Sequence, residues 1–244
     1  MAIPSLLPLL GLWLSACTSS PSAPSPPAAP SLAAAQHEAP VPTPSNLAPI
    51  APSELVVTSG SILPVPEAQA GGEGPAFFAI REPTLRAWVG RTPRSAVEME
   101  FVYRGATAQA APLASGQLRR QIGVEMRAQD SCNVVYVMWH VEPERGIVVS
   151  VKNNPGQSRH AECGDRGYTV LTPEQVRPAP PVRKGERHLL AAVLSDRELV
   201  VSVDNVRTWV GRLPPAALGF DGPVGIRSDN GQFDVRLRAR RPGL

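Results

Sequence analysis

The chain of 244 residues carries 24 Lys and Arg residues against 21 Asp and Glu residues, which gives a formal net charge of +3. No basic run is interleaved with aromatic residues, so composition excludes nucleic acid as an expected partner. Beyond an unusual N-terminal region, about 190 residues remain, enough for one domain with a substantial hydrophobic core.

The chain opens with an apolar segment, residues 3–13, that runs into Leu14-Ser15-Ala16-Cys17. This segment has the length of a signal-peptide hydrophobic region and is shorter than the ~20 residues that cross a bilayer. The four-residue motif resembles the lipobox of bacterial lipoprotein signal peptides. That resemblance implies a signal peptide over residues 1–16, export, cleavage before Cys17 and lipidation of Cys17.

Residues 17–53 form a stretch of mainly Pro, Ala and Ser in which Glu38 is the only charged residue. Such a composition buries too little apolar surface to offset the entropy lost on ordering, so we expect a disordered linker. Its prolines favour extended structure, with a reach on the order of 100 Å. In enterobacterial lipoproteins, Asp after the lipidated Cys favours the inner membrane. Thr18 at that position therefore implies the outer membrane of the cell envelope.

From residue 54 to residue 244, apolar residues recur at every second position, which is typical of strands with one buried face. The clearest alternating segments are residues 97–103, 122–126, 135–141, 147–151, 199–203 and 233–237. No amphipathic helix of useful length is apparent. Only residues 173–175 and 214–218 are expected to form single helical turns.

Two dipeptides predict tight turns between strands. Asp204-Asn205 separates two strand-like runs, and Asn230-Gly231 is the stronger hairpin signal because both residue types tolerate positive φ. Many short strands with such turns predict an all-β fold, a two-sheet sandwich or jelly roll, with a barrel as the alternative.

Cys132 and Cys163 remain once Cys17 is set aside, an even pair in a chain that we expect to be exported. A disulfide between them is the preferred interpretation, and it would add a few kcal/mol of stability. Unpaired thiols are one alternative. A metal site that also uses His140 or His160 is another, but the spacing matches no zinc motif.

Three motifs occur in the order found in concanavalin A-like domains. Residues 123–130 (GVEMRAQD) lead into 133–137 (NVVYV), residues 199–205 read LVVSVDN, and residues 222–229 (GPVGIRSD) precede Phe233-Asp234. They resemble the laminin-G-like and 3-keto-disaccharide-hydrolase-type branch of that group, over about residues 54–240. The resemblance implies a two-sheet jelly roll whose concave face or rim often holds glycans.

The alternation also sorts the polar side chains by face. If segments 97–103, 122–126 and 135–141 share one sheet, their outward side chains form a common surface, a candidate for binding sugar hydroxyls. The set consists of Glu98, Glu100, Glu125, Arg127, Tyr136 and His140. A solvated sheet face without a ligand accounts for the same charges. Trp139 has the parity of the core positions, whereas Trp88 and Trp209 suit either the core or a ligand.

Catalysis by Glu98 and Glu100 is the enzymatic alternative. Two positions apart on a strand, their backbones lie about 6.5–7 Å from each other, which permits a glycosidase-like carboxylate pair. The E-x-D-x-x-E strand of related glucanases is absent, as is a G-x-S-x-G nucleophile elbow. The sequence therefore favours a binding domain over a glycoside hydrolase.

No cofactor is expected, apart from calcium at the rim, which some laminin-G-like domains hold. Its candidate ligands are Asp204, Asp229 and Asp234, although turn chemistry accounts for the first two. The main functional hypothesis is an envelope lipoprotein, anchored to a membrane, whose β-sandwich binds a polysaccharide or another envelope component. An architectural domain that binds an envelope protein through a sheet face or edge is the further alternative.

Overall fold

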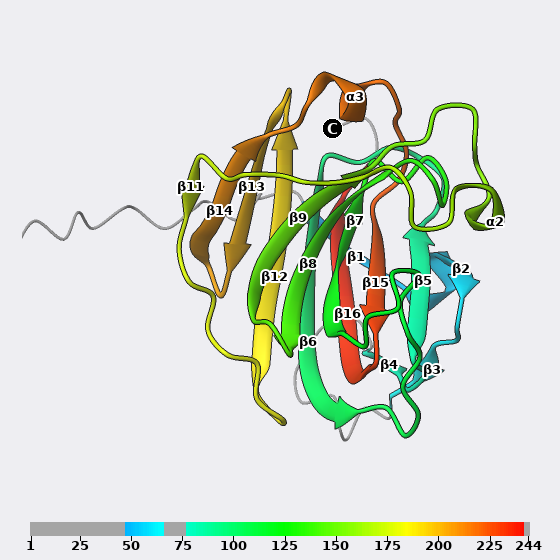
Figure 1. Ribbon diagram of the computed structural model, residues 1–244. Helices are drawn as coiled ribbons and strands as arrows, with labels where there is room; N and C mark the ends of the chain where they lie inside the picture. The colour runs from blue at the N-terminus through cyan, green and yellow to red at the C-terminus, as the bar shows by residue number, and fades with distance from the viewer. Residues whose placement is uncertain (1–46, 66–76, 242–244) are drawn as a thin grey trace, which may run out of the picture. The chain divides into compact units, whose positions relative to one another are not determined.

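The computed structural model describes residues 47–65 and 77–241 (Figure 1). The predicted signal peptide, Cys17 and most of the predicted linker lie outside these residues. Within the described part, no helix is long and apolar enough to cross a membrane.

The described strands form two antiparallel sheets, one of nine strands and one of seven. The nine-stranded sheet has the order β11 (Gln175–Val176), β14 (Val206–Arg212), β13 (Glu198–Val203), β12 (Arg187–Ser195), β6 (Ala96–Ala106), β16 (Gly231–Arg240), β4 (Phe78–Ile80) and β3 (Leu63–Pro64), and β1 (Leu47–Ile50) also pairs with β16.

The seven-stranded sheet has the order β10 (Tyr168–Val170), β9 (Gly146–Lys152), β8 (Val134–Glu142), β7 (Arg120–Met126), β15 (Gly225–Asp229), β5 (Thr84–Val89) and β2 (Leu55–Ser59). Helical structure among the described residues is limited to η1 (Pro52–Glu54), α2 (His160–Cys163) and α3 (Pro215–Leu218). The predicted all-β, two-sheet jelly-roll sandwich is confirmed.

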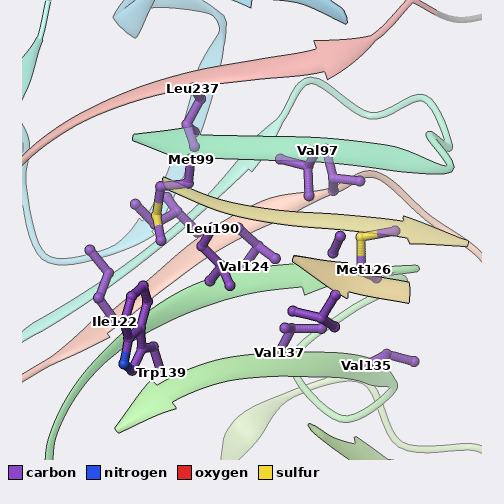
Figure 2. Packing of buried hydrophobic residues seen from close by; sticks show 14 of the residues in the cluster. Val97, Met99, Ile122, Val124, Met126, Val135, Val137, Trp139, Leu190 and Leu237 are labelled. Carbon is purple, nitrogen blue, oxygen red and sulfur yellow. The ribbon is translucent and has the colours of Figure 1, made fainter. Parts of the chain in front are cut away.

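The hydrophobic core lies between the two sheets and consists of the alternate residues predicted to face inward. Figure 2 shows side chains of β6, β12 and β16 packing toward those of β7 and β8. Trp139 is 1% exposed and packs edge-to-face against Phe101, with ring centroids 5.5 Å apart. Trp209 also belongs to this core. The alternate positions of apolar residues along each strand therefore predicted correctly which of them face the core.

The first strand lies within the segment predicted to be a disordered linker. Residues Leu47–Ile50 pair with β16, and the Ile50 side chain is buried in the core. The prediction was wrong for residues 47–53, because backbone pairing with a strand almost 190 residues later leaves no mark on local composition. The ordered domain thus begins before residue 54.

The two predicted turns have different roles. Asp204 and Asn205 both have positive φ, 49° and 64°, and connect β13 to β14 as a hairpin, as predicted. Asn230 also has positive φ, 58°, but it connects β15 of one sheet to β16 of the other. The hairpin prediction at Asn230-Gly231 was therefore wrong, because a local turn signal does not determine which strands pair.

The two predicted helical turns have different outcomes. α3 occupies most of the expected helical turn at residues 214–218, whereas residues 173–175 form no helix and lead into β11.

Cys132 and Cys163 form a disulfide that joins the loop before β8 to α2. This pairing replaces the alternatives of free thiols and a metal site for these two cysteines.

Truncating Trp139 should destabilise the domain more than any exposed substitution. We expect Trp139→Ala to lower the free energy of unfolding by about 3–5 kcal/mol, because it leaves a cavity between the sheets. Val176→Ala is the control, since Val176 is 63% exposed on an edge strand, and should change stability by less than about 0.5 kcal/mol. Urea denaturation measures both. Equal effects would contradict the assignment of Trp139 to the core.

Candidate functional site

The outward side of the seven-stranded sheet carries the candidate site, which we call the cleft face. It is defined by the outward side chains of β5, β7, β8, β9, β10 and β15. Strand register arranges them in cross-strand rows. The three central rows are Trp88–Gly225–Glu125–Tyr136–Ser150, Arg86–Arg227–Gly123–Met138–Val148 and Thr84–Asp229–Gln121–His140.

Two neighbouring hollows lie over the cleft face. One has a volume of about 480 Å³ and extends from the loop at residues 112–119 to Tyr168 and Val170. The other, of about 440 Å³, reaches Trp88 and Lys152. The hollows share the residues Arg86, Tyr136, His160 and Tyr168, so they form adjoining parts of one surface.

A buried ion pair lies in the floor of the larger hollow. Arg227 and Asp229 are only 6% and 2% exposed, and Arg227 Nε donates to Asp229 Oδ2 at 2.8 Å. Gln121 Nε2 donates to the same oxygen at 2.7 Å. Burial opposes the charged form of Arg227, but Asp229, Tyr136 and Tyr168 together outweigh burial and raise the pKa of the guanidinium. Arg227 therefore stays charged within the floor.

Aromatic rings stack above this ion pair. The Arg227 guanidinium lies 4.8 Å from the centroid of Tyr136, and Tyr136 stacks on Tyr168 with centroids 5.9 Å apart. Lys152 Nζ lies 5.2 Å from the Tyr168 centroid. Tyr136 is buried, whereas Tyr168 is 41% exposed. Tyr168 thus offers the accessible aromatic surface of the cleft face, held in place by cation–π and stacking contacts.

Glu125 is a buried carboxyl group in the smaller hollow. Trp88 Nε1 donates to Glu125 Oε2 at 2.7 Å, while Oε1 is buried without a hydrogen-bond partner among the described residues. Gly225 lies between the two side chains in the register, where a Cβ atom would come within 2.8 Å of the Trp88 ring. Burial raises the pKa of Glu125 to about 7, so it is only partly ionised at neutral pH.

Lys152 connects the cleft face to the disulfide segment. Its side chain is 1% exposed, and Nζ donates to the carbonyl oxygens of Ser131 and Gly164 at 3.1 and 2.7 Å. These two residues flank the cysteines of the Cys132–Cys163 disulfide. Burial lowers the pKa of Lys152 to about 8. The disulfide and this amine together position one wall of the cleft.

The opposite wall is the loop at residues 107–119, which Asn230 holds. Asn230 Nδ2 donates to the carbonyls of Ala111 and Arg119 at 2.9 and 3.0 Å, and Oδ1 accepts from the Ala111 amide at 2.7 Å. Arg119 then lies over His140, with Nη1 3.4 Å from Nε2. Burial, and after it the nearby charge of Arg119, lower the pKa of His140 to about 4, so the ring is neutral at pH 7.

The six residues predicted to share a surface lie in three places. Glu125, Tyr136 and His140 lie together on the cleft face. Arg127 has positive φ, 53°, just beyond β7, and its side chain donates to the carbonyl oxygen of Phe220 in the segment after α3. Arg127 therefore holds a loop. The prediction placed it on the sheet face because the strand pattern was extended one residue beyond the end of β7.

Glu98 and Glu100 belong to β6, in the other sheet, so the assumption of one shared sheet was wrong. Glu100 pairs with Arg187 and with Arg236, whose Nε lies 2.6 Å from Oε2, and Arg238 lies 3.9 Å from Glu98. Neither carboxylate lines the two hollows described above. This geometry is that of an ion-paired outer face, and it provides no support for a catalytic pair.

Several cleft-face residues escaped the sequence analysis. Arg86 and Arg227 occupy outward positions of β5 and β15, but nothing local placed these strands beside β7. Gln121 lies one position before the segment that was recognised. No pattern indicated Lys152 or Tyr168, because burial of the amine and exposure of the ring depend on the disulfide segment.

The three aspartates considered for calcium are held by separate partners. Asp204 accepts from the Leu189 amide at 2.8 Å, Asp229 pairs with Arg227, and Asp234 pairs with Arg104 at 2.6 Å. Over residues 47–65 and 77–241, no group of three or more His, Cys, Asp or Glu side chains is arranged to hold a metal ion.

The raised pKa of Glu125 predicts a specific pH dependence of stability. The unfolded chain releases this proton near pH 4.5, whereas the folded state keeps it until pH about 7. Stability from this group is therefore present at low pH and is lost as pH rises through that window. Relative to Glu125→Gln, which can retain the hydrogen bond from Trp88, the wild type should lose about 3 kcal/mol between pH 4.5 and 8. Urea denaturation across that range measures the difference, and parallel curves would contradict it.

Comparison with known proteins concerns the fold. No family model and no curated protein matches the sequence. Among solved structures, the chain is similar to the carbohydrate-binding module CBM66 from Bacillus subtilis, with a TM-score of 0.50 and 8% identity over 75% of this chain and 91% of that chain. The Emp47p carbohydrate recognition domain gives a TM-score of 0.45 and 12% identity, covering 81% of this chain and 98% of its own. The likeness to the CBM66 module, at this low identity, supports the two-sheet sandwich alone.

Proposed function

We propose that this protein is an exported lipoprotein that displays a carbohydrate-binding β-sandwich, with the glycan held on the cleft face. The observation that carries the proposal is the exposed ring of Tyr168 beside a hollow of about 480 Å³ with a polar floor. An aromatic ring next to fixed donors and acceptors suits a sugar, which presents C–H groups on one side and hydroxyl groups around its rim.

Hydrogen-bonding groups of both kinds line the larger hollow. Arg86 and Gln117 supply N–H donors, while Ser150 and Asp165 supply oxygen acceptors. The floor is rigid, since Arg227, Asp229 and Gln121 hold one another. A preorganised floor loses little conformational entropy when a ligand binds, which favours affinity. The carbohydrate-binding module CBM66 shares the fold, which agrees with this proposal.

The proposed location rests on the N-terminal sequence. Leu14-Ser15-Ala16-Cys17 resembles a lipobox, and the stretch rich in Pro, Ala and Ser that follows is suited to a spacer. A disulfide within the domain is compatible with an exported protein. Attachment through Cys17 to the outer membrane would present the cleft face to envelope or extracellular polysaccharides.

Binding to glycans tests the function directly. The full chain, applied to a broad array of polysaccharides and oligosaccharides, should bind at least one class. Tyr168→Ala should weaken the affinity for that glycan at least tenfold, a loss of about 1.4 kcal/mol of binding free energy, because it removes the stacking surface. Isothermal titration calorimetry measures the change.

The matched control is Val206→Ala, another exposed apolar residue, placed on the nine-stranded sheet. It should leave the affinity unchanged. Absence of binding to every glycan, together with a protein that copurifies with the chain, would favour the architectural alternative and overturn the proposal.

Lipidation is tested separately. In a bacterial host, the wild-type chain should fractionate with membranes and incorporate a radiolabelled fatty acid. Cys17→Ala should abolish incorporation and release the protein, because it removes the thiol to which the lipid would be attached. Cys132→Ala is the control and should retain the label. A wild-type chain that remains unlabelled would refute the lipoprotein assignment.

A further inference from the structure

Two arginines lie directly opposite each other at the centre of the cleft face. Arg86 of β5 pairs in register with Arg227 of β15. Arg227 has a carboxylate partner in Asp229, but the Arg86 guanidinium has no hydrogen-bond or ion-pair partner within residues 47–65 and 77–241. Like charges at directly opposed positions on neighbouring strands destabilise a sheet, so the arrangement favours an anion between them.

The remaining charges of the cleft face neutralise Arg86 only in part, through its electrostatic attraction to Glu125. Lys152 and Arg119 add positive charge to its walls. These positive charges affect the pKa values of neighbouring basic groups. Burial lowers the pKa values of Lys152 and His160, and the positive charges of Arg86 and Arg227 lower them further.

The acidic groups of the cleft face are mostly engaged. Asp229 is held by Arg227 and Gln121, and Asp130 accepts from the amides of Cys132 and Asn133 at 2.8 Å. Glu125 is only partly ionised at neutral pH, because burial raises its pKa to about 7. Asp165, on the rim, is exposed. The cleft face therefore has an excess of positive charge around Arg86.

Arg86 is also placed to reach a ligand in either hollow. It lines both of them and is only half-buried. A guanidinium group matches the planar, two-oxygen geometry of a carboxylate, and a partly desolvated pair of this kind is stronger than one in open water. These features single out a carboxylate more than a neutral hydroxyl group.

Extending the proposed carbohydrate-binding function, on which this step rests, we infer that the cleft face selects acidic glycans, whose uronic-acid carboxylate pairs with Arg86 while the sugar ring packs on Tyr168.

The test compares one glycan in two charge states. The acidic polysaccharide that binds best in the array is chemically reduced at its carboxyl groups, which yields the neutral sugar on the same backbone. The wild-type full chain should bind the reduced form at least tenfold more weakly by calorimetry. Raising the salt concentration from 50 to about 500 mM should weaken binding of the acidic form and leave the reduced form unaffected.

Variants at one position locate the effect. Arg86→Gln should bind the acidic and reduced glycans with equal, weak affinity, and Arg86→Lys should restore part of the difference because it keeps the charge without the planar fork. Arg187→Gln, on the outer face of the other sheet, removes a more exposed arginine outside both hollows and should leave both affinities unchanged. Circular dichroism melting curves establish that each variant is folded.

Each outcome has a separate meaning. Equal wild-type affinity for the acidic and reduced glycans would overturn the inference and leave the carbohydrate-binding function standing. Failure to bind any glycan would overturn both. Equally tight binding of polyglutamate, a polyanion without sugar, would also overturn the inference, because it would identify a general anion site. The comparison on the wild-type chain decides the question even if Arg86→Gln fails to fold.

Discussion

The central strands of the seven-stranded sheet are buried on both faces, and the cleft face depends on this constraint. β7, β8 and β15 pack their inner side chains in the core, while their outer side chains are also almost entirely covered. A charged group in such a position must find partners within the same layer, because little of it is accessible to water. Arg227, Asp229 and Gln121 satisfy this requirement by binding one another. The result is a floor whose members cannot move independently.

The outer face of the other sheet shows what the same alternation produces with less cover. Glu98 and Glu100 are themselves largely buried, but Arg187 and Arg238, with which they pair, are exposed, and solvent weakens such pairs. On the cleft face, by contrast, two loops rise at the ends of the strands. Asn230 holds one loop, and the disulfide with Lys152 holds the other. The degree of burial therefore distinguishes the cleft face, a candidate site, from the ion-paired outer face of the other sheet.

Asn230 and Arg127 show that a local sequence pattern can be present while the structural role predicted from it is wrong. Both residues adopt positive φ, and for Asn230 the sequence indicated this conformation. Its backbone does turn, but into the opposite sheet, and its side chain anchors a cleft wall. Arg127 ends the strand that the alternation seemed to continue. Residue type made the conformation accessible for Asn230 but not for Arg127, and in both cases the partner lay about 90 to 120 residues away.

Period-two alternation alone determined which side chains of β6, β7, β8 and β16 enter the core, because a strand presents successive residues to opposite faces whatever its neighbours are. It also placed Glu125, Tyr136 and His140 outward and indicated the all-β class. The order of strands came only from the tertiary structure, since backbone pairing is indifferent to side-chain type. That order separated Glu98 from Glu125, set Arg86 opposite Arg227, and brought Tyr168 over Tyr136. The local sequence determines which residues each face of a strand presents. The site exists only because strands and loops that are distant in the sequence meet.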